Sequence, residues 1–464
     1  MINIFFIITK YAGRANCQCL RIWPRYSRVL FTPCLSLCLW WMSDFESFGF
    51  SEAISRNVTR AGFKTPTPIQ KEAIPHALAG KDILGLAQTG TGKTAAFVLP
   101  MLERLGDGSA RKIRALIVAP TRELAEQIHQ VIVTLGKDTR LQSMTIYGGA
   151  SMNRQLADLR KGVDIVVACP GRLLDHLQRK SVTLDAVETL VLDEADQMFD
   201  MGFLPAIKQI VAKLPQKRQT MLFSATMPEE IRKLSSQILR DPVKVELARG
   251  PVATISHALY PVTSELKTPL LLHLLKDAGD QPILVFTKTK HKATRLADQL
   301  AKAGFSTASL QGNLSQNRRD SALAGFKSGK YQILVATDIA ARGIDVNNIS
   351  HIINYDIPAS SETYIHRIGR TARATKSGDA YTFITSEDNR QVREIEKALG
   401  KPIEKRTVKD FDYKGATIAD ITAKINRPPQ PGAAPKAAAP AGEKPKTAGK
   451  PRRRRFQGFG KNRR

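Results

Sequence analysis

The residues with the clearest chemistry form a glycine-rich run, Ala87-Gln88-Thr89-Gly90-Thr91-Gly92-Lys93-Thr94. A short apolar segment precedes the run and a helical pattern follows it, so we expect a strand, a loop and a helix here. Glycines let backbone N–H groups converge on phosphate oxygens, and the start of a helix adds positive potential. Lys93 would then reach the β- and γ-phosphates of a nucleotide, and Thr94 would ligate Mg²⁺. Ala87 departs from the strict pattern, so a plain glycine-rich turn is the alternative.

A second cluster, Asp193-Glu194-Ala195-Asp196, follows the apolar segment 187–192. Two acids directly after a buried strand are costly unless something positive meets them. Asp193 suits a Mg²⁺ ligand, and Glu194 suits a group that orients and deprotonates a water attacking the γ-phosphate. A solvated acidic turn is the alternative, and the phosphate loop upstream argues against it.

A base-reading segment is expected ahead of the phosphate loop. Gln70 carries an amide that can pair with N6 and N7 of adenine. Phe63 or Phe45 could stack on the ring. Phe63 could equally belong to the core.

Short apolar runs alternate with helix-period segments between residues 42 and 426, which predicts parallel α/β sheets. A first set lies at 82–87, 115–119, 164–168, 190–192 and 220–223, and a second at 283–286, 332–336 and 349–355. A segment containing Arg249-Gly250-Pro251 separates the sets and reads as a linker. We therefore predict one domain at 42–247, a linker at 248–257, a second domain at 258–405 and an extension at 406–464.

The composition of the 464 residues narrows the function class. Lys and Arg number 70 against 42 Asp and Glu, a formal charge of +28 that favours a polyanionic partner, most often nucleic acid. A hydrophobic content of 42% excludes wholesale disorder. Five cysteines exclude a disulfide scaffold and fit a reducing compartment. No apolar run reaches the ~18 residues of a membrane span, so we expect a cytoplasmic protein without a membrane partner.

The first 41 residues differ from the rest of the chain. They hold five Lys or Arg, no acid, all three tryptophans and four of the five cysteines. A signal peptide is one interpretation, but the segment before the apolar run is too long and no A-x-A-like cleavage site follows. A zinc site from Cys17, Cys19, Cys34 and Cys38 is another, with poor ligand spacing. We favour translation from Met42, with 1–41 as a non-native or unstructured extension.

The C-terminal tail from Arg427 is rich in Pro, Ala, Gly and Lys and holds 12 Lys or Arg against one Glu. It cannot bury enough apolar surface to offset its ordering entropy, so we predict disorder. Phe456 and Phe459 lie among the arginines and offer stacking faces. The tail could tether RNA nonspecifically, and a plain solvated tail is the alternative.

Taken together, these motifs resemble those of the DEAD-box ATP-dependent RNA helicases of superfamily 2, closest to the bacterial RhlE-like group, over residues 42–405. The matching segments, in the family's order, are Thr65–Gln70 with Phe45, Ala87–Thr94, Pro120–Ala125, Gly148-Gly149, Asp193–Asp196, Ser224-Ala225-Thr226, Ala336–Asp345 and His366–Arg373. The resemblance implies two RecA-like parallel-sheet domains in tandem, with ATP and Mg²⁺ as cofactors. Two departures are Cys169, where the family usually has Thr, and Ala372, where it usually has Gly.

The resemblance also implies residue roles. Lys93, Asp193, Glu194 and two arginine fingers, Arg370 and Arg373, would be catalytic. Asp345 would contact the ribose. Asp196, Ser224, Thr226 and His366 would couple the two halves. The RNA contacts would come from Thr121, Arg122, Gly149, Gly171, Arg172 and Thr337, and contacts of this kind to the RNA backbone carry no sequence information.

The expected function is an ATP-dependent RNA helicase that couples RNA-stimulated ATP hydrolysis to local unwinding or remodelling of short duplexes. Ribosomal precursors or the RNA-degradation machinery are the suggested partners, and the sequence leaves the oligomeric state open. The main alternative is an ATP-gated RNA clamp or chaperone with incidental strand separation. A DNA translocase and an RNA-binding protein with an inactive ATP site are further alternatives.

Overall fold

The computed structural model describes residues 45–88, 90–106, 111–247, 255–341, 349–371 and 378–413. The predictions made for Thr89, Asp345, Ala372 and Arg373 lie outside the described residues. So do those for residues 1–41, for most of the linker and for the basic tail. The described chain forms two seven-stranded parallel sheets.

The first sheet has the strand order β3-β4-β2-β5-β6-β1-β7. Its strands are β1 (Ile83–Leu86), β2 (Ala115–Val118), β3 (Ser143–Ile146), β4 (Ile165–Ala168), β5 (Thr189–Leu192), β6 (Gln219–Ser224) and β7 (Val243–Glu246). Every residue of β2, β4, β5 and β6 is buried. Strands covered on both faces read as continuous apolar runs, which is why the sequence reveals these four.

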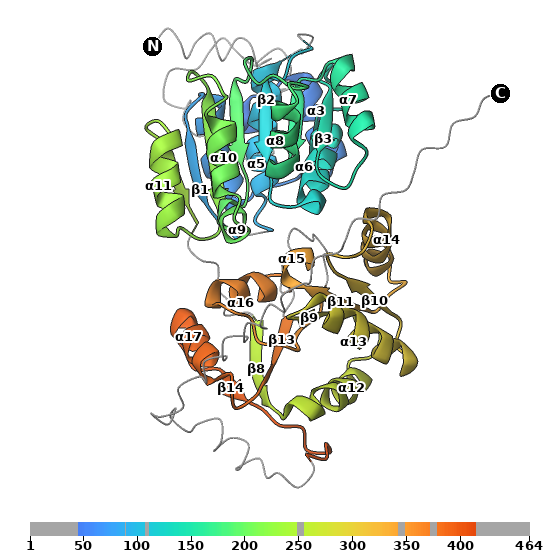
Figure 1. Cartoon of the computed structure of the whole chain (residues 1–464). Coiled ribbons are helices and arrows are strands. Elements are labelled where there is room, and N and C mark those ends of the chain that lie inside the picture. The colour runs from blue at the N-terminus through green and yellow to red at the C-terminus, as the bar shows by residue number, and fades with distance from the viewer. Residues whose placement is uncertain are drawn as a thin grey trace, which may run out of the picture. The chain divides into compact units, whose positions relative to one another are not determined.

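Helices cover both faces of this sheet (Figure 1). One face carries η2 (Glu46–Phe48), α3 (Glu52–Arg60), α4 (Pro68–Leu78), α5 (Lys93–Leu105) and α6 (Arg122–Leu135). The other carries α7 (Met152–Lys161), α8 (Pro170–Gln178), α9 (Ala195–Asp200), α10 (Leu204–Val211) and α11 (Glu229–Ile238). Each face has its own buried apolar cluster, and the Phe97–Phe223 ring pair, with centroids 5.4 Å apart, joins α5 to the sheet.

The second sheet has the order β10-β11-β9-β12-β13-β8-β14. Its strands are β8 (Ile255–Pro261), β9 (Ile283–Thr287), β10 (Thr307–Leu310), β11 (Ile333–Thr337), β12 (His351–Asn354), β13 (Gly378–Ile384) and β14 (Glu404–Lys405). One face packs against η4 (Ser264–Leu266), α12 (Lys267–Asp277) and α13 (Lys290–Lys302). The other packs against α14 (Gln316–Lys327), α15 (Asp338–Ala341), α16 (Ser361–Ile368) and α17 (Asn389–Leu399).

The predicted α/β class is confirmed, and each of the eight apolar runs overlaps a strand. The sequence missed β3, β7, β8, β10, β13 and β14. Strands β3, β7 and β10 lie at or beside an edge and keep partly exposed positions, so their apolar pattern is interrupted. Strand β8 begins at Ile255, inside the range predicted as linker. Beyond β14, Phe411 and Tyr413 pack against the second half, within the range predicted as extension.

The order of the first sheet separates two sets of loops along one edge. The carboxyl ends of parallel strands share an edge, and ligands of open α/β sheets bind there. Strands β5, β6 and β1 are consecutive neighbours in the sheet, and β2, β4 and β3 are consecutive neighbours on the other side of β5. The two sets meet where β2 pairs with β5. This junction is a topological switch point, the usual place for a ligand in such a sheet.

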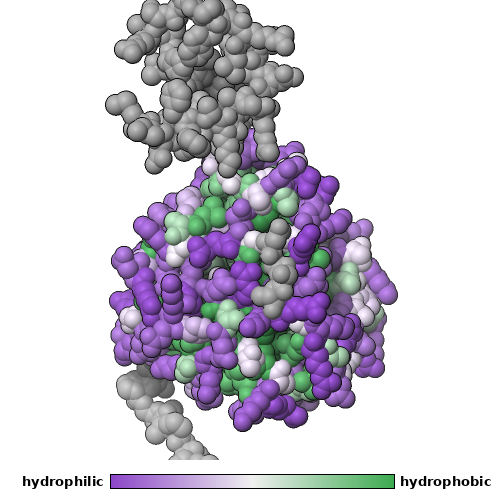
Figure 2. Space-filling model, turned by 90° about the horizontal axis from the view of Figure 1, so that it is seen from above, coloured by the Kyte–Doolittle hydropathy of each residue, from purple (hydrophilic) through white to green (hydrophobic). Residues whose placement is uncertain are grey.

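The face of the molecule shown in Figure 2 is mostly hydrophilic, and its hydrophobic side chains form separate areas. Among the described residues, the large hydrophobic side chains that are exposed are Val133 and Ile339. Within the same ranges, no helix is long and apolar enough to cross a membrane.

Candidate functional site

The phosphate loop connects β1 to α5 and depends on glycines at defined positions. Gly90 and Gly92 have φ of 87° and 92°, in the left-handed region that favours glycine. A Cβ atom on Gly92 would lie 2.6 Å from Gln70 Nε2 and 2.8 Å from Thr67 Oγ1. Gly92 is also the N-cap of α5, so a larger residue would disturb the loop and the start of the helix together.

Lys93 is the first residue of α5 and is buried. Its Nζ donates to Ala87 O at 2.9 Å, and Thr91 Oγ1 donates to Gln88 O at 2.8 Å. The side chain of Lys93 thus folds back across the loop, where it stays close to the N-terminus of the helix. Thr94, the next residue, is half-buried in the first turn.

Gln70 lies on α4 and is buried against this loop. Its Oε1 accepts from Thr67 N at 2.9 Å, and its Nε2 donates to Gly92 O at 3.0 Å. Thr67 and Gln70 form a capping box, which fixes the start of α4. The amide therefore connects α4 to the phosphate loop, and reading of adenine by Gln70 stays a prediction.

Phe45 and Phe63 pack edge to face with centroids 5.8 Å apart. Phe45 is buried in the core of the first half, and Phe63 is partly buried against the same cluster. The packing fits the core interpretation of Phe63, and stacking of either ring on a base stays a prediction.

Asp193 and Glu194 directly follow β5 and are both 2% exposed. Burial raises the pKa of Asp193 to about 7, with a further increase from Glu194, against the opposing effect of Lys93. Glu194 has φ of 53°, an uncommon conformation for a residue with a side chain. Such backbone strain is retained where the surrounding structure fixes it, often at a functional site.

Asp196 links α9 to the segment after β6. Its Oδ2 accepts from Ala225 N at 3.1 Å, from Thr226 N at 2.8 Å and from Thr226 Oγ1 at 3.0 Å. Ser224 Oγ accepts from Asp196 N at 3.2 Å and donates to Thr226 O at 2.7 Å. His366 Nε2, in the second half, lies 3.8 Å from Asp196 Oδ2. The four residues predicted to couple the halves are therefore neighbours.

Arg370 follows α16 and is 4% exposed. One turn before it, Arg367 makes a two-pronged ion pair with Asp338, at 2.6 and 2.8 Å. Arg367 Nη1 also donates to Asn354 Oδ1 at 2.9 Å and to Asp356 O at 2.8 Å. The sequence predicted no role for Arg367, although the three arginines of segment 366–373 were a signal that they could differ in role.

Four of the six predicted RNA-contacting residues, Thr121, Arg122, Gly171 and Arg172, follow β2 and β4 at the carboxyl edge of the first sheet. Thr121 is the N-cap of α6, where its hydroxyl accepts from Leu124 N at 3.3 Å. Gly149, which follows β3, has φ of 83° and is exposed. Arg122 lies beside it, since a Cβ on Gly149 would approach Arg122 Nη1. The structure thus gathers the five predicted residues of the first half, and Thr337 ends β11 in the second.

Two contacts between the halves were not anticipated. Arg122 Nη1 donates to Gln316 Oε1 at 3.1 Å, and Glu123 pairs with Arg319 at 2.6 Å. Gln316 and Arg319 lie three residues apart on α14, a spacing that puts both on one face of a helix. The spacing could have indicated that Gln316 and Arg319 share a face of the helix. A single sequence does not show which residues of the first half contact that face.

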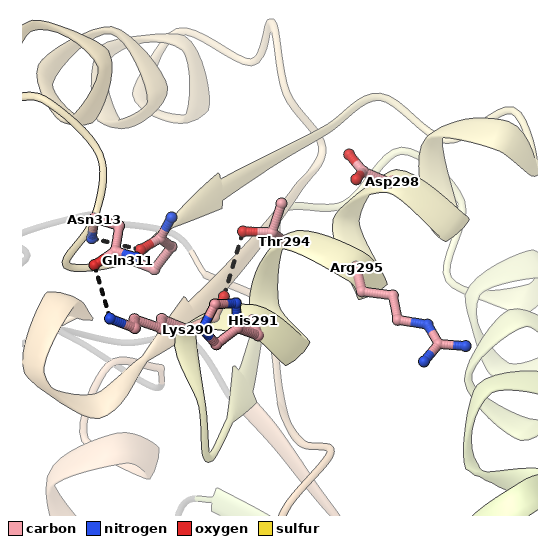
Figure 3. Close-up of a pocket in the computed structure, with 7 residues that line it drawn as sticks. All are labelled: Lys290, His291, Thr294, Arg295, Asp298, Gln311 and Asn313. Atoms are coloured by element: carbon pink, nitrogen blue, oxygen red, sulfur yellow. Dashed lines mark hydrogen bonds between the residues drawn. The ribbon is translucent and has the colours of Figure 1, made fainter. Parts of the chain in front are cut away.

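A polar pocket of about 330 Å³ lies on the second half where β9 leads into α13 and β10 ends (Figure 3). Lys290, His291, Thr294, Arg295, Asp298, Gln311 and Asn313 line it. Lys290 Nζ donates to Asn313 Oδ1 at 3.0 Å. Sequence reasoning did not select these residues, although the basic run from Lys288 to Lys292 directly after a strand was a signal.

Cys169, at the family position usually held by Thr, is the N-cap of α8. It is 9% exposed, and its side chain makes no capping hydrogen bond. Burial raises the pKa of the thiol to about 12. The residue therefore packs as a small apolar group, which does not supply the hydroxyl of a threonine.

Both halves of the chain match known protein families. The family described as DEAD/DEAH box helicase matches residues 67–234, and the helicase conserved C-terminal domain matches residues 266–375. This chain belongs to the DEAD-box family of ATP-dependent RNA helicases. The two matched ranges correspond to the two sheets, so each half carries one of the family's domains.

Similar proteins include bacterial DEAD-box helicases. The DEAD-box ATP-dependent RNA helicase CshA of Bacillus subtilis is 41% identical over 363 residues, which cover 78% of this chain and 73% of that protein. ATP-dependent RNA helicase CshA of Listeria monocytogenes is 43% identical over 362 residues, covering 78% and 69%. These relatives confirm the DEAD-box family, and the finer RhlE-like grouping stays a prediction.

Solved structures of other members share the fold. Dbp5 of S. cerevisiae, bound to RNA and ADP BeF3, aligns with a TM-score of 0.72 at 29% identity, covering 83% of this chain and all of that one. The DEAD-box helicase Mss116, bound to single-stranded RNA and UDP-BeF, aligns with a TM-score of 0.71 at 27% identity, covering 82% of each chain. The tandem RecA-like architecture is thereby confirmed for this DEAD-box protein.

Proposed function

We propose that this DEAD-box protein couples RNA-stimulated ATP hydrolysis to local separation or remodelling of short RNA duplexes. One observation supports this most. The segments after β5, β6 and β1 and those after β2, β4 and β3 share one edge of the first sheet and meet at β2 and β5. A nucleotide at one part of this edge and RNA at the other would each influence the same loops.

On the ATP side, Lys93 would contact the phosphates and Glu194 would orient and deprotonate the attacking water. The donors present suit Mg²⁺: a buried carboxylate on Asp193 and the hydroxyl of Thr94 beside a phosphate site. Across the described residues, no cluster of three acidic, His or Cys side chains could hold a metal. That fits an ion held largely by substrate phosphates. When bound, Mg²⁺ neutralises charge that develops on the phosphates.

The second half would complete the ATP site. Arg370 and Arg373 would contribute as arginine fingers, which raise phosphoryl-transfer rates by roughly 10³–10⁵. Asp345 would contact the ribose. Arg367 supports this arrangement, because its buried ion pair fixes α16 directly before Arg370. Hydrolysis would then be gated by the approach of the two halves.

On the RNA side, arginines, backbone N–H groups and hydroxyls would hold phosphates and sugars without reading bases. Contacts to the 2′-OH would favour RNA over DNA. Lys290 and Asn313 are further candidates for phosphate contact, since they lie at the carboxyl edge of the second sheet. RNA-bound structures of the relatives Dbp5 and Mss116 support this proposal.

At the level of the cell, we propose action in the cytoplasm on ribosomal precursors or with RNA-degradation machinery. This rests on analogy with the RhlE-like group rather than on a site. The tail from Arg427, with 12 Lys or Arg, would keep RNA near the catalytic domains.

Substitution of Glu194 by Gln tests the proposal. The Glu194→Gln protein should bind ATP and RNA together but hydrolyse ATP at least about 100-fold more slowly, because a general base contributes roughly 10²–10⁴. Glu230→Gln makes the same change at an exposed position on α11 and should behave as wild type. Normal turnover in Glu194→Gln would contradict the assignment. ATP-dependent RNA retention by wild-type protein without strand release in a duplex assay would instead favour the clamp function.

A further inference from the structure

The buried amide of Gln155 contacts two separate parts of the candidate RNA surface. Gln155 lies on α7 and is 5% exposed. Its Oε1 accepts from Arg172 Nη1 at 3.3 Å, and its Nε2 donates to Tyr147 O at 3.0 Å. Tyr147 directly precedes Gly148-Gly149. One side chain therefore connects the arginine of α8 to the glycine loop that follows β3.

His176 makes a further hydrogen bond to the amide of Gln155. It is fully buried on α8, and its Nε2 lies 3.0 Å from Gln155 Oε1. Because a carbonyl oxygen only accepts, Nε2 must carry the proton, and Nδ1 is left to accept from the Ser181 hydroxyl, whose Oγ lies 2.8 Å from Nδ1 and 3.0 Å from His176 O. Burial, aided by Arg172, lowers the pKa of His176, which favours this neutral ring. A flipped amide would place an NH₂ group against two donors, so the network fixes the orientation of Gln155.

The guanidinium of Arg172 is hydrogen-bonded through Nη1, and its other terminal nitrogen can contact a ligand. Nη1 also donates to Ala150 O at 3.1 Å, and the side chain is 14% exposed. Within the described ranges, Nη1 donates the hydrogen bonds of this guanidinium and Nε lies 3.6 Å from Asp175 Oδ2, which leaves Nη2 for a ligand. Nη2 lies next to the glycine loop, because a Cβ on Gly148 would be 4.0 Å from it. The nitrogen left for a phosphate is thus beside the backbone expected to bind the same strand.

We propose that Gln155, supported by His176, is a positioning residue for RNA binding. It holds Arg172 and the Gly148-Gly149 loop in the geometry that receives RNA phosphates, and it does not touch RNA itself. The inference rests on the proposed RNA contacts of Arg172 and Gly149. A long side chain that is ordered before binding loses less freedom when the ligand arrives, so its pre-organisation strengthens binding.

The first test replaces Gln155 by Met, which keeps the length of the side chain and removes both hydrogen-bonding groups. Gln155→Met should weaken binding of a short single-stranded RNA about tenfold, the equivalent of losing a typical hydrogen bond to a charged group. KM for ATP, and kcat at saturating RNA, should stay within about twofold. Gln237→Met, the same change at an exposed position of α11, is the control and should bind RNA like wild type.

The second test separates positioning from general stability. His176→Leu removes the donor that faces Gln155, whereas His176→Gln retains an N–H donor there. His176→Leu should weaken RNA binding and His176→Gln should restore most of it, both measured well below the unfolding temperature. These variants also carry the test if Gln155→Met does not fold. In ¹⁵N-resolved NMR spectra of wild type, the His176 ring should be protonated at Nε2, and Gln155→Met should shift that resonance.

A double-mutant cycle with Arg172→Ala decides whether Gln155 acts through the arginine. If it does, Gln155→Met should cost less than about threefold in RNA affinity once Arg172 is gone. Equal tenfold losses in both backgrounds would overturn the proposal, as would wild-type RNA affinity in both Gln155→Met and His176→Leu. Absence of RNA binding by wild-type protein would instead overturn the proposed function, and the positioning role with it.

Discussion

Thr226 donates two hydrogen bonds to one oxygen of Asp196, from its backbone N–H at 2.8 Å and from its hydroxyl at 3.0 Å. The last acid of the Asp-Glu-Ala-Asp motif is thus fixed to the segment that follows β6. Asp196→Asn removes the negative charge on which these donors converge. The new side chain presents to them either an amide nitrogen, which cannot accept, or a neutral oxygen, which accepts more weakly. We expect a loss of about 1–3 kcal/mol in unfolding free energy and a lower RNA-stimulated ATPase rate, measured by urea unfolding and by phosphate release.

Thr226→Val is the matched comparison for Asp196→Asn, because it removes one of the donors to Asp196 Oδ2 and keeps both backbone donors. Its loss of stability should be smaller, about 1 kcal/mol. An Asp196→Asn protein as stable and active as wild type would show that the carboxylate is not needed to organise this segment.

Arg367 makes a buried, two-pronged ion pair in the second half. Its side chain is 3% exposed and meets Asp338 through two nitrogens. Arg367→Lys cannot reproduce the planar fork, so it should cost about 3 kcal/mol or more, measured by urea unfolding of the second half. Arg390→Lys, in an exposed pair with Glu394, should change stability by less than about 0.5 kcal/mol. Equal effects of the two substitutions would contradict the assigned role of Arg367.

Cys169 is the N-cap residue of α8, but its side chain makes no capping hydrogen bond. Its φ and ψ of −86° and 139° suit a capping residue, and Thr121 already caps α6 through its hydroxyl. Cys169→Thr should therefore raise the unfolding free energy by about 1 kcal/mol. Cys169→Val has the same shape without the hydroxyl and should gain nothing. Thermal unfolding of the three proteins gives the comparison, and a Val variant as stable as the Thr variant would exclude a capping effect.

The neutral state of His176 predicts how stability depends on pH. Burial, followed by Arg172, lowers its pKa from the ordinary value of 6.5. In the unfolded chain the ring takes up a proton below that pH, whereas the folded protein resists it. Stability is therefore fully present above about 6.5 and falls as pH decreases. Urea unfolding between pH 7.5 and pH 5 should show a shallower fall for His176→Gln than for wild type.

His291→Gln, at an exposed position, is the control for the pH experiment. Its unfolding free energy should follow that of wild type across the range. Identical curves for wild type and His176→Gln would mean that His176 does not contribute to the acid sensitivity of the fold.

The sequence predicted the segments that carry chemistry because their residue types are tied to phosphate and Mg²⁺ binding. Lys93 and Asp193 follow apolar runs, and the alternation of such runs with helical segments predicts the parallel sheets that bring them to one edge. Family resemblance added Asp196, Thr226 and His366, which no local pattern distinguishes from ordinary polar residues.

The sequence did not reveal the roles of Gln155, Arg367, Gln316 and Arg319. Each of these side chains acts through partners distant in the chain: Gln155 meets Arg172, and Arg367 meets Asp338. Such pairings depend on how the helices pack against the sheets. The sequence around a polar residue on a helix does not indicate which distant side chain it will contact. Edge strands β3 and β10 were missed for a related reason, since half-exposed strands lack a continuous apolar run.

RNA-dependent ATP hydrolysis is tested by steady-state ATPase measurements on the full chain without nucleic acid, with single-stranded RNA and with DNA of the same sequence. We expect slow hydrolysis alone, strong stimulation by RNA and little by DNA, because phosphate and 2′-OH contacts would complete a site that the two halves share. Equal stimulation by DNA, or a rate that RNA does not change, would contradict it.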